Sequence, residues 1–123
     1  MTQEEKQLLL TDLCARLPHG VNLYIEFYDL QGDGKLASRD IKLTPGNIAY
    51  CFDNSHWVSV KPYLRPMSSM TEEERQDFAY YVAHGNNSVA LDFVDWCNAH
   101  HFDHRGLIGK GLALEAPEGM YKN

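Results

Sequence analysis

The sequence predicts an α+β fold in which residues 1–123 form a single domain, with an N-terminal helix, a small four-stranded antiparallel sheet and two C-terminal helices packed on it. Three observations predict this class. Apolar residues recur at helical spacing near the N-terminus, they alternate with period two from Val21 onward, and helical spacing returns after Thr71. A chain of 123 residues is long enough to bury a hydrophobic core without disulfide bonds or metals.

The first helix is expected over residues 2–17. Thr2 and Glu5 have the spacing of a capping box, in which the hydroxyl and the carboxylate each accept a hydrogen bond from a backbone amide at the start of the helix. Pro18 and Gly20 are expected to end it, because neither residue suits a helix interior. The face that this helix is expected to bury has residues at positions i, i+3, i+4 and i+7, namely Leu10, Leu13, Cys14 and Leu17.

Four short strands are predicted after this helix. Odd-numbered residues from Val21 to Phe27 are apolar and alternate with more polar ones, which is the pattern of a half-buried strand. Turn residues separate this run from the apolar runs that follow it, so the strands are expected to form an antiparallel meander. A turn at residues 53–56 joins the last two. The four strands are expected at residues 21–28, 35–43, 48–52 and 57–60.

The first turn of this meander resembles a calcium-binding EF-hand loop. Asp29, Asp33 and Gly34 occupy loop positions 1, 5 and 6, but positions 3 and 9 carry no carboxylate and Asp40 replaces the bidentate Glu at position 12. The flanking residues have the period of strands, and Pro45 leaves no room for an exiting helix. A hairpin turn is therefore the favoured interpretation.

Two further helices are expected after an extended connector at residues 61–66, which contains two prolines. Thr71 and Glu74 have the spacing of a second capping box. The last helix is predicted from Val89 to about His101. The faces that these helices are expected to bury consist of Phe78, Tyr81 and Val82 in the first and of Ala90, Phe93, Val94, Cys97 and His101 in the second.

The composition excludes several classes of protein. Acidic residues outnumber basic ones by 17 to 11, which gives a formal net charge of −6, so a nucleic-acid partner is not expected. No apolar run approaches the roughly 20 residues of a membrane span, and the polar N-terminus is unlike a signal peptide. The three cysteines, Cys14, Cys51 and Cys97, have no paired spacing, which is typical of reduced thiols in a cytoplasmic protein.

Residues 95–108 contain one Trp, one Cys, three His, two Asp and one Arg. If the last helix continued through this stretch, four potential metal ligands would share one broad face. Their spacing matches no named zinc signature, and no metal is expected. A nucleophilic Cys–His pair is a weaker alternative, because a cysteine on an apolar helix face is usually an inert core thiol. The four potential ligands are Cys97, His100, His101 and His104.

A structural interpretation of the same residues is favoured. Two histidines at the C-terminal end of a helix suit the negative end of its dipole. The neighbouring aromatic residues, Trp96 and Phe102, are expected to pack in the core. Arg105 is expected to pair with Asp103 or with a backbone carbonyl.

Several phrases of the chain resemble a family of small uncharacterised proteins encoded in phages, prophages and genomes of anaerobic gut bacteria. They are LCARLP-x-G at residues 13–20, KPYLRPMSSMTEEE at 61–74, W-x-NAHHFD-x-RGLI at 96–108 and GLALEAPEGMY at 111–121. The resemblance covers about half of the chain. The resemblance implies that a mobile genetic element encodes the chain, and it implies no mechanism because the family has no established activity. The family phrase has Leu in place of Cys97 and Tyr in place of His104, which disfavours a shared metal site.

The leading hypothesis is a non-enzymatic accessory protein in the cytoplasm of a bacterial host, which modulates a host process by binding a host or phage protein or a small ligand. No cofactor is expected. The alternatives are an enzyme, either a zinc-dependent or a Cys–His hydrolase, and a structural homo-oligomer. The expected binding surface lies between the connector and the histidine-rich stretch, and it consists of Tyr63, Arg65, Trp96, His100, His101, Asp103 and Arg105.

Overall fold

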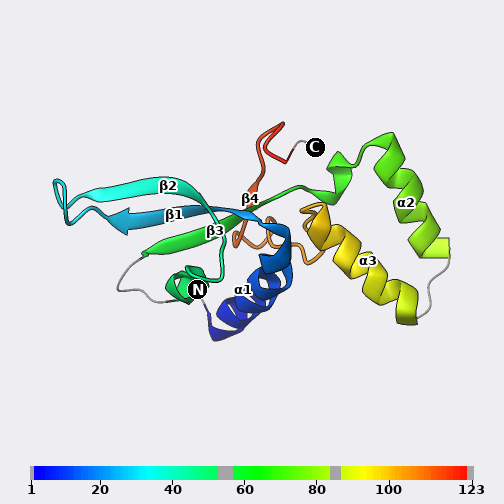
Figure 1. Cartoon of the computed structure of the whole chain (residues 1–123), viewed down its shortest axis with the longest axis horizontal. Coiled ribbons are helices and arrows are strands. Elements are labelled where there is room, and N and C mark those ends of the chain that lie inside the picture. The colour runs from blue at the N-terminus through cyan, green and yellow to red at the C-terminus, as the bar shows by residue number, and fades with distance from the viewer. Residues whose placement is uncertain (1, 53–56, 84–86, 122–123) are drawn as a thin grey trace.

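A computed structural model of the chain describes residues 2–52, 57–83 and 87–121. Within these residues it confirms the α+β class, with three α-helices and one four-stranded sheet (Figure 1). The predicted turn at 53–56 and the side chains of Val82 and Ala90 lie outside the described part. The helices are α1 (Gln3–Arg16), α2 (Glu72–Ala83) and α3 (Asn87–Ala99), and the strands are β1 (Asn22–Tyr28), β2 (Leu36–Lys42), β3 (Ser59–Leu64) and β4 (Leu114–Glu115).

The sheet has the strand order β2-β1-β3-β4 and is mixed. Strand β1 pairs antiparallel with β2 and with β3, which confirms the predicted hairpin, whereas β4 pairs parallel with β3 through the Tyr63↔Leu114 register. The prediction of an entirely antiparallel sheet is therefore wrong. The fourth strand of the observed sheet, β4, comes from the C-terminal segment, which is far in sequence from the predicted meander.

Residues 48–52 form a 3₁₀ helix, η2 (Ile48–Phe52), so the strand predicted there is wrong. The side chain of Asn47 accepts a hydrogen bond from Thr44 N at 2.8 Å and donates one to Lys42 O at 3.0 Å. Ile48 N then donates to Thr44 O at 3.1 Å. These bonds turn the chain directly after β2, and the amide of Ile48, at the start of the predicted strand, is bonded within this turn.

Strand β3 begins later than predicted and includes most of the expected connector. Its burial alternates residue by residue, and Val60, Pro62 and Leu64 face the core. The two prolines of the connector indicated extended backbone, which is confirmed, but they concealed a period-two pattern in which Pro62 is one of the buried residues.

Helix α1 begins with the predicted capping box, because Thr2 N donates to Glu5 Oε1 at 2.8 Å and Glu5 N donates to Thr2 Oγ1 at 3.1 Å. Its buried face is rotated from the predicted one, and Cys14 is exposed. The difference arises because two charged residues of the helix pair with each other and occupy the buried face. The buried residues of α1 are Leu9, Asp12, Leu13 and Arg16.

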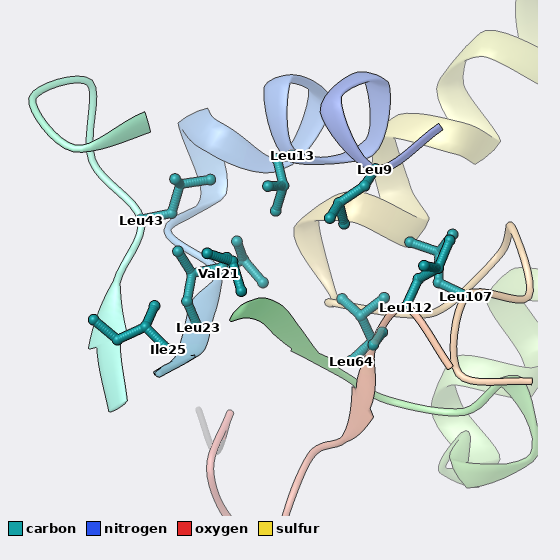
Figure 2. Packing of buried hydrophobic residues seen from close by; sticks show 11 residues of the cluster. Leu9, Leu13, Val21, Leu23, Ile25, Leu43, Leu64, Leu107 and Leu112 are labelled. Carbon is teal, nitrogen blue, oxygen red and sulfur yellow. The ribbon is translucent and has the colours of Figure 1, made fainter. Parts of the chain in front are cut away.

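The hydrophobic core lies between α1, the inner face of the sheet and the loop before β4. Figure 2 shows Leu9 and Leu13 of α1 directed toward side chains of β1 and β3 and toward Leu107 and Leu112 of the loop. The loop thus contributes to the same core as the N-terminal helix. The buried apolar cluster consists of Leu9, Leu13, Val21, Leu23, Ile25, Leu43, Val60, Leu64, Leu107, Leu112 and Ala113.

The two C-terminal helices lie at one end of the sheet (Figure 1). Helix α3 contacts α1, and α2 contacts α3. The rings of Phe78 in α2 and Phe93 in α3 meet edge to face with centroids 5.5 Å apart. The face of the sheet that both helices were expected to cover is instead covered by α1. Within the described residues, none of the helices combines the length and the apolarity that crossing a bilayer requires.

Candidate functional site

The segment after β3 and the histidine-rich stretch lie side by side. Arg65 N donates to His101 O at 2.7 Å, and Asp103 N donates to Arg65 O at 2.8 Å. These two bonds form a parallel bridge between Arg65 and Phe102. The predicted neighbourhood of connector and histidine-rich stretch is therefore present, and main-chain hydrogen bonds fix it.

Helix α3 ends two residues before the predicted end at His101. Phe102 N donates to Cys97 O at 2.8 Å and His101 N donates to Asn98 O at 3.2 Å, which is the hydrogen-bond pattern of a Schellman motif. His101 has a φ of 64° and occupies the left-handed position where glycine is usual. The chain reverses there, so the residues after His101 leave the helix and cannot continue its faces.

Arg65 and Glu74 form the central ion pair of the site. Two parallel hydrogen bonds join them, from Nη1 to Oε2 at 2.8 Å and from Nη2 to Oε1 at 2.7 Å. The guanidinium lies 4.2 Å from the ring centre of Phe102, and His100 Nδ1 lies 3.3 Å from Glu74 Oε2. The hydrogen bonds from Arg65 lower the pKa of Glu74 to about 2. Glu74 also completes the predicted capping box of α2 with Thr71.

A stack of aromatic rings packs against this ion pair through Phe102 and His100. The ring centroid of Trp96 lies 4.7 Å from that of His100 and 5.5 Å from that of Phe102. Phe102 is fully buried. Arg65, Trp96 and His100 of the predicted binding surface are thus brought together, and Phe102 anchors them to the core.

We call the region where Arg65 and Glu74 meet residues 96–108 the junction. Asp103 and Arg105 lie on its interior side. Asp103 accepts hydrogen bonds from Leu107 N at 2.8 Å and from Ile108 N at 2.9 Å, so its carboxylate closes the turn that leads into the C-terminal segment. Arg105 Nε donates to Asp12 Oδ1 at 3.1 Å. The prediction that Arg105 pairs with Asp103 or with a carbonyl is therefore wrong, because its partner is a carboxylate of α1.

The partner of Arg105 belongs to a buried charge cluster that the sequence did not reveal. Asp12 Oδ2 accepts a hydrogen bond from Arg16 Nε at 2.7 Å, and both side chains are 0% exposed. Arg16 Nη2 donates to Phe102 O at 2.7 Å. The available signal was the i, i+4 spacing of an acid and a base beside the leucines of α1, which also fits a solvent-exposed pair.

His101 contacts the C-terminal tail, and Tyr63 contacts both the tail and the neighbouring sheet. The His101 ring stacks on Tyr121 with centroids 3.8 Å apart. The Tyr121 hydroxyl donates to Tyr63 O at 2.6 Å and accepts from Asn22 N at 2.9 Å. The Tyr63 hydroxyl donates to Asp40 Oδ1 at 2.8 Å, on the sheet, so this predicted site residue contributes its backbone and not its side chain to the junction.

The four potential metal ligands have separate surroundings. His100 contacts Glu74, His101 stacks on Tyr121, and His104 Nε2 lies 2.9 Å from Asn98 Oδ1. Burial raises the pKa of the Cys97 thiol to about 11, so it is protonated near neutral pH. The described part of the chain contains no group of three or more His, Cys, Asp or Glu side chains that could hold a metal ion.

A groove of about 740 Å³ opens beside the Arg65–Glu74 pair. The start of α2 forms one wall and the tail after β4 forms the other. The C-terminal residues of this groove were not selected from the sequence, because only the parallel β3–β4 pairing brings them here. We call it the acidic groove, and its side chains include Arg65, Glu73, Glu74, Asp77, His100, Glu115, Glu118 and Tyr121.

No family model, curated protein or solved structure matches this chain. The chemistry of the junction and the groove therefore follows from their geometry alone.

Burial gives the junction a predicted pH dependence. Burial and nearby cationic groups lower the pKa of His101 from 6.5 to about 4. Between these pH values the unfolded chain binds a proton at His101 that the folded protein does not, so the free energy of unfolding should fall as pH decreases from 6.5 through 4. In His101→Asn, which also tolerates a positive φ, this decline should be shallower. Denaturant titrations across that range measure it, and equal declines in both proteins would contradict the assignment.

Proposed function

We propose that this chain is a non-catalytic binding protein, an accessory protein of a phage or related mobile element, and that its acidic groove holds a basic segment of a host protein. The observation that carries the proposal is the charge of the groove. Four of its carboxylates have no ion-pair partner among the described residues. They are Glu73 and Asp77 from α2, Glu115 from β4 and Glu118 from the tail after it.

Among the described residues that line this groove, Arg65 carries the only guanidinium, and that group is neutralised within the protein. Both of its terminal nitrogens donate to Glu74, so Arg65 does not offset the four carboxylates. An exposed ion pair contributes about 0.2–1 kcal/mol, so a partner needs several cationic side chains to bind measurably. Carboxylates on both walls suit an extended Lys- or Arg-rich segment that pairs with each wall in turn.

The groups that a hydrolase would require favour binding over catalysis. The Cys97 thiol is held protonated by burial, and the half-buried His101 imidazole stacks on Tyr121. His100 and Arg65 are both engaged by Glu74. Since the Cys97 thiol is buried and the other candidate groups contact neighbours within the protein, the exposed carboxylates of the groove are better placed to meet a ligand.

Fluorescence anisotropy with a labelled oligolysine peptide tests this proposal. The native protein should bind the peptide, and added salt should weaken the complex because the contacts are exposed ion pairs. The double variant Glu115→Gln/Glu118→Gln should bind about tenfold more weakly, which corresponds to about 1.4 kcal/mol for two lost pairs.

The matched control is Glu4→Gln/Glu26→Gln, which removes two carboxylates outside the groove. This control should bind the peptide as the native protein does. An equal loss of affinity in both double variants would contradict the proposal, because it would show attraction to the net charge and not to the groove. Light scattering on the same samples separates peptide binding from self-association.

A further inference from the structure

Strand β2 forms one edge of the sheet, and among the described strands it pairs only with β1 (Figure 1). In an antiparallel pair, residues that are hydrogen-bonded to the partner strand alternate with residues that are not. Leu43 N donates to Val21 O and Asp29 N donates to Lys35 O, at the two ends of the same register. The odd-numbered residues of β2 therefore face β1, and the even-numbered residues direct their N–H and C=O groups to the open edge.

Three of the even-numbered residues have free main-chain groups at this edge. Within the described part of the chain, no hydrogen bond engages the outward N–H or C=O of Leu36, Ser38 or Asp40. All three residues are exposed, and the side chain of Leu36 is 51% exposed. The free stretch ends at Lys42, whose carbonyl oxygen accepts a hydrogen bond from Asn47 Nδ2 at 3.0 Å. The edge thus presents a row of donors and acceptors on alternate residues.

The charged side chains at the centre of β2 do not protect this edge. Native proteins often place charged side chains on an edge strand, where they prevent pairing with other chains. Here they lie back over their own sheet. Arg39 Cζ lies 5.5 Å from the ring centre of Phe27 in β1, and the Asp40 carboxylate accepts a hydrogen bond from the Tyr63 hydroxyl of β3 at 2.8 Å. Both charges are thereby drawn away from the edge, which leaves its main-chain groups accessible.

We propose that the β2 edge pairs antiparallel with the β2 edge of a second copy of this chain, so that the four strands of each copy form one continuous sheet. The two-fold axis passes between the Ser38 residues of the two copies, perpendicular to the sheet, and both α1 helices lie on the same face. Leu36 of each copy lies opposite Asp40 of the other. Each of these residue pairs exchanges two main-chain hydrogen bonds.

The distribution of charge along β2 selects this register. A two-fold axis at Ala37 would place Lys35 opposite Arg39 of the second copy. An axis at Arg39 would oppose the two Arg39 residues, and an axis at Asp40 would oppose two carboxylates. Like charges directly opposite each other destabilise a strand pair. With the axis at Ser38, Arg39 lies opposite Ala37 and no like charges are opposed. The edge matches itself in hydrogen-bonding positions and in charge, which identifies a second copy as its partner.

Sedimentation velocity of the full-length protein over a concentration series tests the dimer. The native protein should convert from monomer to dimer as its concentration rises. Ser38→Lys should weaken dimerisation about tenfold, because it places two cations opposite each other at the axis. The matched control, Ser68→Lys, adds the same charge at an exposed residue outside β2 and should dimerise as the native protein does. A native protein that stays monomeric up to its solubility limit, or equal weakening in both variants, would overturn the proposal.

Cysteine crosslinking tests the register without adding a charge. The background is Cys14→Ser, which removes the exposed thiol, and burial raises the pKa of Cys51 and Cys97 to about 11, so both react slowly. Ser38→Cys should form a disulfide-linked dimer with oxidised glutathione, because paired Cα atoms about 5.5 Å apart suit a disulfide. Leu36→Cys should not, because its two copies lie about 13 Å apart along the strands. Equal crosslinking of both variants would contradict the register.

Dimerisation through β2 leaves the acidic groove open, because β2 and β4 lie at opposite edges of the sheet. Glu115→Gln/Glu118→Gln should therefore dimerise as the native protein does, and Ser38→Lys should still bind oligolysine. Each proposal can thus fail without the other. Loss of the dimer in the groove variant would contradict the assigned surface.

Discussion

Replacing Asp12 with alanine is expected to destabilise the protein by about 3–5 kcal/mol, the range for breaking a buried ion pair. The carboxylate contacts Arg16 at 2.7 Å and Arg105 at 3.1 Å, and the Asp12 and Arg16 side chains are fully buried. Without it, two guanidinium groups would face each other with no anion between them. Denaturant unfolding of Asp12→Ala measures the loss directly.

Two further variants define the cause of that loss. Gln7→Ala changes an exposed residue of the same helix and should alter stability by less than about 0.5 kcal/mol. Asp12→Leu/Arg16→Met replaces both charges with apolar groups and should be less destabilised than Asp12→Ala, because no unpaired buried charge remains at Arg16. If the double variant were the less stable of the two, the pairing would not be the source of the effect.

Replacing Phe102 with alanine is expected to cost about 3–5 kcal/mol, as for other buried aromatic residues. The ring is fully buried between the Arg65 guanidinium and Trp96. Its removal leaves a cavity at the point where α3, the residues after β3 and the C-terminal segment meet. Oligolysine binding should weaken in the same variant, because the Arg65–Glu74 pair, which holds the start of α2 and so positions Glu73 and Asp77 in the acidic groove, would lose its support.

The control for Phe102 is Val94→Ala, which truncates an exposed side chain of α3. It should change stability by less than about 0.5 kcal/mol and leave peptide binding intact. Thermal and denaturant unfolding of both variants provide the comparison. A Phe102→Ala protein as stable as Val94→Ala would show that the junction is not part of the cooperative core.

Local features of the fold were predictable from the sequence. The Thr2–Glu5 and Thr71–Glu74 capping boxes are present, because each depends on residues three positions apart. The hairpin of β1 and β2 is also present, since its alternation and its turn are local signals. The look-alike calcium loop is that turn, where Gly34 N donates to Asp29 O at 2.8 Å.

Features that depend on distant residues were not predictable in the same way. Strand β4 contains only Leu114 and Glu115, and its pairing with β3 leaves no periodic pattern in two residues. The apolar run at 48–52 is too short for periodicity to distinguish a strand from a helical turn. Asp12 and Arg16 have a spacing that is usual at the surface. They are buried because residues distant in sequence pack over them, where Arg16 bonds to Phe102 O and Asp12 to Arg105.

The candidate site was predicted only in part, because it too depends on contacts between residues that are distant in sequence. The bridge between Arg65 and Phe102 brings together the two segments selected from the sequence. The left-handed His101 then ends α3 and directs His101 and His104 to different partners, which separates the potential metal ligands. The carboxylates of the tail enter the groove only because β4 joins the sheet.

The structural role of the histidine-rich stretch is tested most directly by native-state hydrogen exchange of the Asp103, Leu107 and Ile108 amides. These amides donate to Arg65 O and to the Asp103 carboxylate. If the stretch locks the C-terminal segment to the core, they should exchange only through global unfolding, with the same opening free energy as the amide of Leu23 in β1. Exchange through a much smaller local opening, while Leu23 remains protected, would contradict that role.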